Sequence, residues 1–442
     1  MNDDEAQEFL SLGDNLEPNQ ALSPDSELFV DTAQARGSFS FHGLYQRLGV
    51  DPQTLRLLKA PDRRYLLFLG HIGCGKSTEL RRLQRNLHTP NCYHVLLLDA
   101  RSELDPQNLQ YVDLLLACAE RLCATLQANG LTVASVHLER LHNWFVQHVE
   151  TRMTDKTLST ELVTTAQAGF DLPLIGSLLA KLTNAFKYNA SYKDELRKVV
   201  RNSFAEFATT FNILIAEATR LLQQNNLGAG LLFIVDGTDK LNSEDSCRFF
   251  IEDVHQLQQI RANFIYGAPM QMLFESSALQ QHYSALYRLP MIKLYNRDGS
   301  PGDPVARATL QDLVLRRVPL RWFDSMESVD YLIDHCGGHP RDLVRLLSSA
   351  WQTARQYRID RAAAEKAVAS AASDFRRLLE AKDYALLHRI DAGEEEEGER
   401  PELIKLFNIL ALLEYNDHWW RSHPVVQLLP GYRSHAAAAP PA

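Results

Sequence analysis

Apolar residues along the chain gather in short continuous runs, separated by stretches with helical spacing. Five such runs predict strands, at residues 65–69, 93–99, 231–236, 263–267 and 289–294. Nearly continuous apolar strands that alternate with helices are typical of a parallel sheet covered on both faces. We therefore expect a three-layer α/β fold, with a parallel sheet between helices.

A helical insertion is predicted over residues about 130–225. Residues 107–127 predict an apolar helix that packs on the sheet, and 132–152 predict a second helix before a patch at 168–176 that glycine and proline interrupt. Farther on, apolar residues recur at alternating steps of four and three, as in a coiled coil. These seam residues are Val200, Phe204, Phe207, Phe211, Leu214, Ala218 and Leu221. The seam either packs on its own chain or contacts another subunit or an effector protein. Membrane binding through 168–180 is a weaker alternative, because few charges flank that segment.

The most specific motif follows the first strand run. The run Gly70-His71-Ile72-Gly73-Cys74-Gly75-Lys76-Ser77 lies between an apolar strand and a helical pattern that starts at Thr78. This context distinguishes a phosphate-binding loop from a chance glycine-rich turn. Glycines let backbone N–H groups turn toward phosphate oxygens, Lys76 adds a charge for the β- and γ-phosphates, and the Ser77 hydroxyl suits Mg²⁺. We predict that Gly70 to Thr78 bind ATP or GTP together with Mg²⁺.

A second nucleotide signal ends the strand run at 231–236. Asp236 is expected at the carboxyl edge of the sheet, beside the phosphate loop, where its carboxylate can hold Mg²⁺ through the water shell of the ion. Many P-loop ATPases place a glutamate directly after this aspartate, whereas Gly237 stands there in this chain. Asp239 is the nearest residue that could orient the attacking water, and a solvated turn aspartate paired with Lys240 is the alternative. The sequence thus predicts an ATPase with slow turnover.

Composition indicates the number of domains, the partners and the compartment of the protein. The 442 residues suggest two or three domains, and 45% hydrophobic with 23% charged residues is ordinary for a globular protein. A formal net charge of −9 does not favour nucleic acid as the main partner. No signal peptide or membrane span is expected, and six cysteines without paired spacing indicate a reduced, cytoplasmic compartment. Cys74 lies near a helix N-terminus, so we expect its alkylation to block nucleotide binding.

A third motif, CGGHPRDLVRLL, spans Cys336 to Leu347. Alone it is a turn before a helix. Taken in order with GHIGCGKSTEL and LLFIVDGTDKL, it resembles the AAA+ and STAND-type P-loop ATPases, particularly the origin-recognition-like branch with a helical lid and a C-terminal winged helix. The resemblance covers residues 25–435 and favours ATP over GTP. It implies that Pro340 lies near the adenine and Arg341 near the γ-phosphate, with Arg345 as the second candidate.

The same resemblance implies one further catalytic residue. An arginine just before the last core strand reaches the nucleotide of a neighbouring subunit in AAA+ rings, and Arg288 occupies the matching place. A structural surface arginine is the alternative. The polar sensor expected after the fourth strand is missing, since that stretch offers only Tyr266. We therefore do not expect ring-type hydrolytic cycling.

The domain organisation follows from these motifs. We expect an N-terminal segment, a P-loop ATPase core containing the insertion, a helical lid that ends in one long helix over 361–390, an acidic linker, a winged-helix-like domain and a disordered tail. Their respective bounds are 1–60, 61–300, 301–390, 391–400, 401–435 and 436–442.

Three functions are compatible with this sequence. The first is an ATP-dependent switch that controls self-assembly or an effector protein, in bacterial signalling or anti-phage defence. The second is an ATPase that remodels or loads nucleic acid, which the origin-recognition resemblance suggests. The few basic residues around the winged helix do not favour it. The third is a nucleotide-binding adaptor without turnover, because Gly237 replaces the glutamate.

Overall fold

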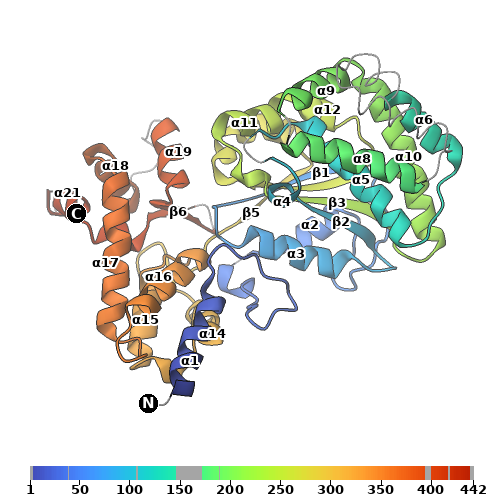
Figure 1. Ribbon diagram of the computed structural model, residues 1–442. Coiled ribbons are helices and arrows are strands. Elements are labelled where there is room, and N and C mark those ends of the chain that lie inside the picture. The colour runs from blue at the N-terminus through green and yellow to red at the C-terminus, as the bar shows by residue number, and fades with distance from the viewer. Residues whose placement is uncertain are drawn as a thin grey trace. The chain divides into compact units, whose positions relative to one another are not determined.

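The computed structural model describes residues 3–37, 39–105, 108–145, 172–188, 190–393, 400–416 and 419–438 (Figure 1). Contacts divide the chain into two compact units. We call Met1–Ser40, Gly70–Glu79 and Arg288–Ala442 the lid unit, and Phe41–Leu69 and Leu80–Tyr287 the sheet unit. These bounds differ from the expected domains chiefly because the phosphate loop groups with the C-terminal part of the chain.

The sheet unit is built around a five-stranded sheet in the order β2-β3-β4-β1-β5. Its strands are β1 (Arg64–Gly70), β2 (Tyr93–Asp99), β3 (Gly230–Asp236), β4 (Asn263–Pro269) and β5 (Ala285–Leu289). Both β2 with β3 and β3 with β4 pair in parallel. Every residue of β3 and β4 is buried, so both faces of the sheet are covered. The predicted α/β fold with a parallel sheet is confirmed.

The last strand is displaced from its predicted position. It covers Ala285–Leu289 instead of 289–294, so Arg288 lies within the strand and not before it. Pro290 has no N–H group with which to continue the ladder. The next two amides bond elsewhere in the lid unit, Met291 N to Glu414 O at 3.0 Å and Ile292 N to Gly338 O at 3.1 Å. The apolar run therefore predicted burial correctly and strand structure wrongly.

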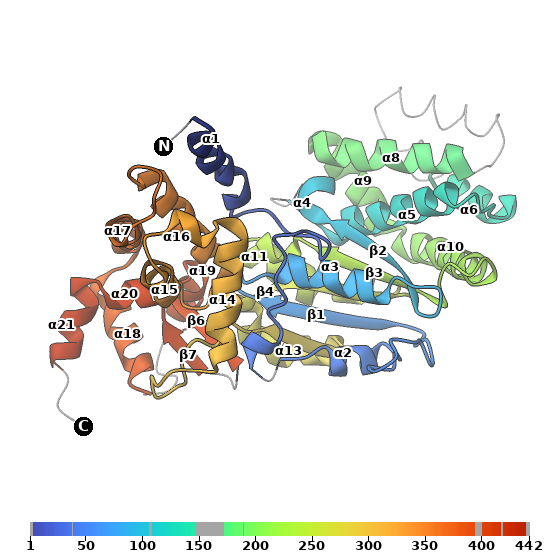
Figure 2. The same ribbon diagram turned by 90° about the horizontal axis from the view of Figure 1, so that it is seen from below.

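Helix α5 and the helices of the insertion gather on one side of the sheet (Figures 1 and 2). They are α5 (Tyr111–Ala128), α6 (Ser135–Phe145), α8 (Leu172–Tyr188), α9 (Ala190–Asn202) and α10 (Phe204–Gln224). The predicted helix at 132–152 is described only to Phe145, and 168–171 lie outside the described residues. The remainder of the glycine- and proline-broken patch is the start of α8, where Pro173 occupies the first turn.

The apolar seam of the insertion is divided between two helices, and its residues are buried. It breaks at Ser203, which leaves Val200 on α9 and the other six residues on α10. All seven belong to one buried core that also holds Phe233 and Phe264 of the sheet. The seam therefore packs on its own chain, as the first of the two alternatives predicts, and contact of the insertion with a partner stays a prediction.

The other helices of the sheet unit are short, apart from α3, which begins in the lid unit. They are α2 (His42–Arg47), α3 (Lys76–Leu87), α4 (Ala100–Glu103), α11 (Ser243–Cys247), α12 (Val254–Leu257), α13 (Ser276–His282), the 3-10 helices η4 (Thr238–Lys240) and η6 (Met270–Glu275), and the π-helical turn η5 (Arg248–Glu252).

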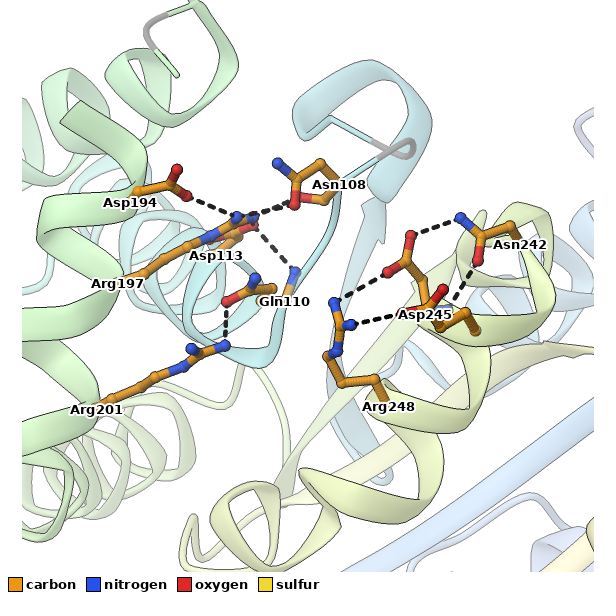
Figure 3. Close-up of polar contacts among 10 residues, drawn as sticks. Asn108, Gln110, Asp113, Asp194, Arg197, Arg201, Asn242, Asp245 and Arg248 are labelled. Carbon is orange, nitrogen blue, oxygen red and sulfur yellow. Dashed lines mark hydrogen bonds and ion pairs between the residues drawn. The ribbon is translucent and has the colours of Figure 1, made fainter. Parts of the chain in front are cut away.

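A polar cluster ties α9 of the insertion to α5 and to the residues just before it (Figure 3). Arg197 and Asp113 are both buried, and Arg197 Nε donates to Asp113 Oδ1 at 2.9 Å while Nη1 donates to Asn108 Oδ1 at 2.9 Å. Burial raises the pKa of Asp113, and the Arg197 charge works against that rise. The pair fixes the insertion to the rest of the sheet unit.

Four helices form the centre of the lid unit and pack side by side (Figures 1 and 2). They are α14 (Pro304–Arg317), α15 (Met326–Asp334), α16 (Pro340–Thr353) and α17 (Arg361–Leu378). The N-terminal helix α1 (Asp3–Ser11) joins the same core, where Phe9 lies 6.0 Å from the Trp351 ring and 5.3 Å from the Trp322 ring. Short 3-10 helices complete this part: η1 (Leu12–Leu16), η2 (Gln34–Arg36) and η7 (Leu320–Trp322).

The predicted long helix over 361–390 is two helices. Between α17 and α18 (Ala381–Asp391), Leu379 adopts an extended backbone, and Glu380 and Asp383 form a capping box that starts the new helix. The C-terminal part continues with α19 (Arg400–Asn408), β6 (Leu412–Tyr415), β7 (Trp419–Ser422), α20 (Pro424–Gln427) and α21 (Pro430–Ala438).

The C-terminal part can be compared with two expectations, the winged helix and the disordered tail. The strands β6 and β7 pair as an antiparallel hairpin, with Leu412 opposite Ser422, and the winged helix stays a prediction. Helix α21 reaches Ala438, so the expected disordered tail begins within a helix. Linker residues 394–399 and tail residues 439–442 lie outside the described residues. Among the helices that the structure describes, none is long and apolar enough to cross a membrane.

Candidate nucleotide site

The phosphate loop has the backbone that its sequence predicts. Gly73 and Gly75 have φ values of +89° and +105°, a region that side chains other than glycine rarely adopt. A Cβ atom on Gly73 would lie 2.8 Å from His339 Cε1 and 2.9 Å from Arg341 Cβ. The loop therefore turns against the first residues of α16, with no room for a side chain at Gly73.

Lys76 is buried and held over its own loop. Its Nζ donates to Gly70 O at 2.7 Å and to His71 O at 2.8 Å. Ser77 and Thr78 follow in the first turn of α3 and are partly exposed. A glycine cradle, an ammonium and a hydroxyl at a helix N-terminus are the donors and the metal ligand that a magnesium triphosphate requires. These residues fit that group.

His71 links the loop to the C-terminal hairpin. Its Nε2 accepts a hydrogen bond from Glu414 N at 3.0 Å, and its ring stacks on Phe407 with 5.1 Å between centroids. Because Nε2 accepts, the proton of the neutral ring lies on Nδ1. Burial, with smaller contributions from the charges of His339 and Lys76, keeps the pKa of His71 well below its ordinary value. The imidazole is thus a neutral bridge between loop and hairpin.

The start of α16 contacts the same loop through a residue that sequence reasoning missed. His339 is fully buried, its Nε2 lies 2.9 Å from Ile72 O, and its Nδ1 accepts from Asp342 N at 3.1 Å. Pro340 is the first residue of the helix, and Arg341 Nε donates to Pro18 O at 3.2 Å. His339 could have been predicted from its place before Pro340, where a side chain can cap the helix. The motif was used to predict roles for Pro340 and Arg341 only.

Asp342 lies between two histidines. Its Oδ2 is 3.2 Å from His339 Nδ1 and 3.5 Å from His423 Nε2, and its Oδ1 accepts from Arg345 Nη1 at 3.2 Å. Burial alone would raise the pKa of Asp342, but the two histidines hold it well below its ordinary value. An ionised carboxylate thus lies between α16 and the segment after β7.

Arg36 is a second loop contact outside the predicted set. Its Nη2 donates to Cys74 O at 2.7 Å, its Nε donates to Thr32 Oγ1 at 2.9 Å, and Nη1 also donates to Pro290 O. No motif marks this arginine, because it lies in an irregular N-terminal segment. Cys74 itself is fully buried, and the effect of its alkylation on nucleotide binding stays a prediction.

Arg288 is engaged within its own chain. Its Nη1 lies 3.6 Å from Oε1 of the buried Glu414, whose Oε2 accepts from Trp420 Nε1 at 3.2 Å. Burial raises the pKa of Glu414, and the Arg288 charge counteracts the rise. Its role at a neighbouring subunit stays a prediction.

The predicted acids belong to the sheet unit. Asp236 ends β3 in register with Asp99 at the end of β2, and its Oδ1 accepts from Gly237 N at 2.8 Å. Gly237 has φ +86°, and a Cβ atom there would lie 2.9 Å from Arg101 Cγ. Asp239 is buried in η4, which excludes the alternative of a solvated turn residue. The catalytic and magnesium roles of these acids stay predictions.

Tyr266 is a core residue. It is fully buried on β4, and its ring stacks on Phe264 with 5.4 Å between centroids. Burial raises the pKa of its hydroxyl well above the ordinary value, and no hydrogen-bond partner for that hydroxyl lies among the described residues. Tyr266 therefore does not supply the polar sensor that the fourth strand lacks.

Comparisons with known proteins give matches among solved structures alone. No protein-family model matches the chain, and no curated protein matches its sequence. The RuvB Holliday junction branch migration motor of Thermotoga maritima matches at 11% identity and TM-score 0.36, covering 96% of this chain and 99% of that one. A Walker-type ATPase of Pyrococcus abyssi matches at 12% and 0.42, covering 93% and 98%, and Cdc6p of Pyrobaculum aerophilum at 13% and 0.34, covering 92% and 98%. All three TM-scores lie below 0.5, so these matches carry no argument about the fold of this chain. Their TM-scores carry no argument about activity or partners.

Proposed function

We propose that the chain binds ATP with Mg²⁺ at the phosphate loop and acts as a nucleotide-dependent switch. The supporting observation is that three separate segments of the lid unit bond to this loop. Arg36 donates to Cys74 O, His339 contacts Ile72 O, and Glu414 N donates to His71. A change in the conformation of the loop would therefore alter its contacts with the N-terminal segment, with α16 and with the C-terminal hairpin.

Lys76 gives the switch its trigger. Its ammonium donates to Gly70 O and His71 O, and a phosphate would compete with these two oxygens for the same charge. His71 is also the residue that accepts from Glu414 N. ATP would then favour one of two loop arrangements, which is the differential affinity that a ligand-driven switch requires.

The remaining predicted residues have roles around this trigger. Ser77 and Asp236 would hold Mg²⁺, which neutralises phosphate charge when bound, and Asp239 would orient the attacking water. Pro340 and Arg341 would lie at the nucleotide as the motif resemblance implies. Gly237 offers no side chain for catalysis, so we expect hydrolysis to be slow.

The partner of the switch is proposed as a second copy of the chain or an effector protein, in bacterial signalling or defence. The experiment is binding of a fluorescent N-methylanthraniloyl ATP together with size-exclusion chromatography and phosphate release. We expect wild type to bind and change its elution, and Lys76→Ala to lose at least tenfold in affinity, whereas exposed Lys366→Ala serves as the matched control. Equal binding by all three proteins, or an elution volume that ATP never changes, would contradict the proposal. DNA-stimulated hydrolysis that falls steeply with salt would indicate a nucleic-acid ATPase instead.

A further inference from the structure

A cavity of about 280 Å³ lies in the lid unit between α16, α17 and residues of the C-terminal part. We propose that it binds a small, uncharged amphipathic molecule that regulates the nucleotide switch. The regulatory half of this inference rests on the proposed function, whereas the binding half does not.

Two helix faces form the main walls. Helix α16 contributes Asp342, Arg345, Leu346 and Ser349, and α17 contributes residues from Ala367 to Leu378 at steps of three and four. Such spacing places each set on one helix face. Small side chains such as Ala367, Ser370 and Ala371 keep the helices from filling the space between them. The volume is close to the lower limit of about 300 Å³ for small-molecule sites, so the ligand must be small.

The body of the ligand would be apolar. Phe375 and Leu378 of α17 line the cavity with Ile409 and Val425 from the C-terminal part. Leu378 is 51% exposed, although it is a large aliphatic residue at the end of its helix. A ligand that covers this side chain would remove apolar surface from water.

The head of the ligand would accept hydrogen bonds. His423 is 2% exposed, and its Nδ1 accepts from Val425 N at 3.2 Å, so the neutral ring carries its proton on Nε2. That Nε2 faces Asp342 Oδ2 at 3.5 Å, a contact longer than an ordinary N–H···O hydrogen bond. Arg345, on the same wall, has 51% of its side chain exposed and uses Nη1 on Asp342. A buried donor whose one acceptor lies this far away is poorly satisfied, and an acceptor on a ligand would complete its hydrogen bonding.

The charges at the cavity favour an uncharged head. Asp342 is balanced by Arg345 at 3.2 Å, and Asp374 by Arg377 at 3.4 Å. A carboxylate would meet the negative charge of Asp342 beside the two donors, whereas an amide carbonyl would not.

The cavity wall is joined to the phosphate loop through two residues. Asp342 N donates to His339, and His339 contacts Ile72 O of the loop. A ligand that moves α16 relative to the C-terminal part would thus alter the contact of His339 with the loop. The site is suited to regulate nucleotide affinity.

The test uses 3-phenylpropionamide as the probe and its charged analogue 3-phenylpropionate as the comparison. Saturation-transfer NMR on the full chain without nucleotide should show the amide binding wild type more tightly than the carboxylate. Ala371→Phe, which fills the cavity, should weaken the amide at least tenfold, and Ala369→Phe, exposed on the same helix, should not. Ser370→Phe at the cavity rim gives a second reading if Ala371→Phe does not fold. No amide binding to wild type, or equal binding to the filled variants, would overturn the site.

A second arm tests regulation. Saturating amide should change the dissociation constant of N-methylanthraniloyl ATP at least threefold in wild type and not in Ala371→Phe. An unchanged constant with the amide bound would overturn regulation. A chain that binds the amide but no nucleotide would contradict the proposed function and leave the binding site standing.

Discussion

At the residue scale, the phosphate loop owes its position to contacts that no local motif encodes. Its glycines and Lys76 were predictable because their spacing is fixed by phosphate chemistry. Arg36, His339 and Glu414 were not, because their contacts with the loop span 38, 267 and 343 positions of the chain. Single-sequence patterns report neighbours within a few turns, whereas these bonds depend on how the lid unit folds.

Gly73 tests whether the loop needs its contact with α16. Gly73→Ala should lower nucleotide affinity at least tenfold, because the new Cβ would lie 2.8 Å from His339 Cε1. Gly130→Ala is the control, since Gly130 also has positive φ at +65° and nothing lies within 4 Å of its Cβ position. Fluorescent nucleotide titration of both variants separates the clash from the backbone cost of about 1 kcal/mol. Equal losses in the two variants would contradict the account of the loop.

Burial of His71 makes the free energy of unfolding depend on pH. Its pKa is well below 6.5 in the folded chain, so the unfolded chain binds more protons once pH falls below that value. The free energy of unfolding should therefore decrease as pH falls from about 6.5, by as much as about 1.4 kcal/mol per pH unit from this residue. Chemical denaturation at pH 7.5 and 5.5 should show a smaller loss for His71→Gln than for wild type. Identical losses would show that burial of neutral His71 contributes nothing.

At the element scale, hydrophobic periodicity predicted what is buried better than what secondary structure results. The seam from Val200 to Leu221 was correctly apolar, but Ser203 breaks it into two helices and the sheet covers it. The run at 289–294 was correctly buried, yet Pro290 ends the strand. A pattern of apolar residues indicates that a face is buried. Which element covers that face depends on tertiary contacts.

The Arg197 pair tests how the insertion is held (Figure 3). Arg197→Met should lower the free energy of unfolding by about 3–5 kcal/mol, because Asp113 would remain buried and charged without its partner. Adding Asp113→Leu should restore much of the loss. Arg248→Met is the control, since Arg248 pairs with Glu244 and Asp245 at a side-chain exposure of 37% and should cost at most about 1 kcal/mol. A loss for Arg197→Met no larger than for Arg248→Met, measured by denaturant titration, would refute the anchoring role.

At the scale of the whole molecule, the lid unit unites segments from both ends of the chain with the phosphate loop. The loop is therefore as much a part of the lid unit as a continuation of β1. This arrangement is the basis of the proposed switch, and Gly237 after Asp236 is the basis of the slow hydrolysis that we expect. The parallel sheet between helices could be predicted from the sequence, whereas the strand order and the membership of the loop in the lid unit could not, because both rest on long-range contacts.

The central claim is that nucleotide binding at the phosphate loop changes the conformation of the C-terminal hairpin. Hydrogen exchange at residues 405–416, measured with and without magnesium ATP, tests it most directly, because Glu414 N donates to His71 of the loop. We predict that ATP changes exchange in this segment at least tenfold in wild type and leaves it unchanged in Lys76→Ala. Unchanged exchange in a wild-type chain with ATP bound would contradict the account.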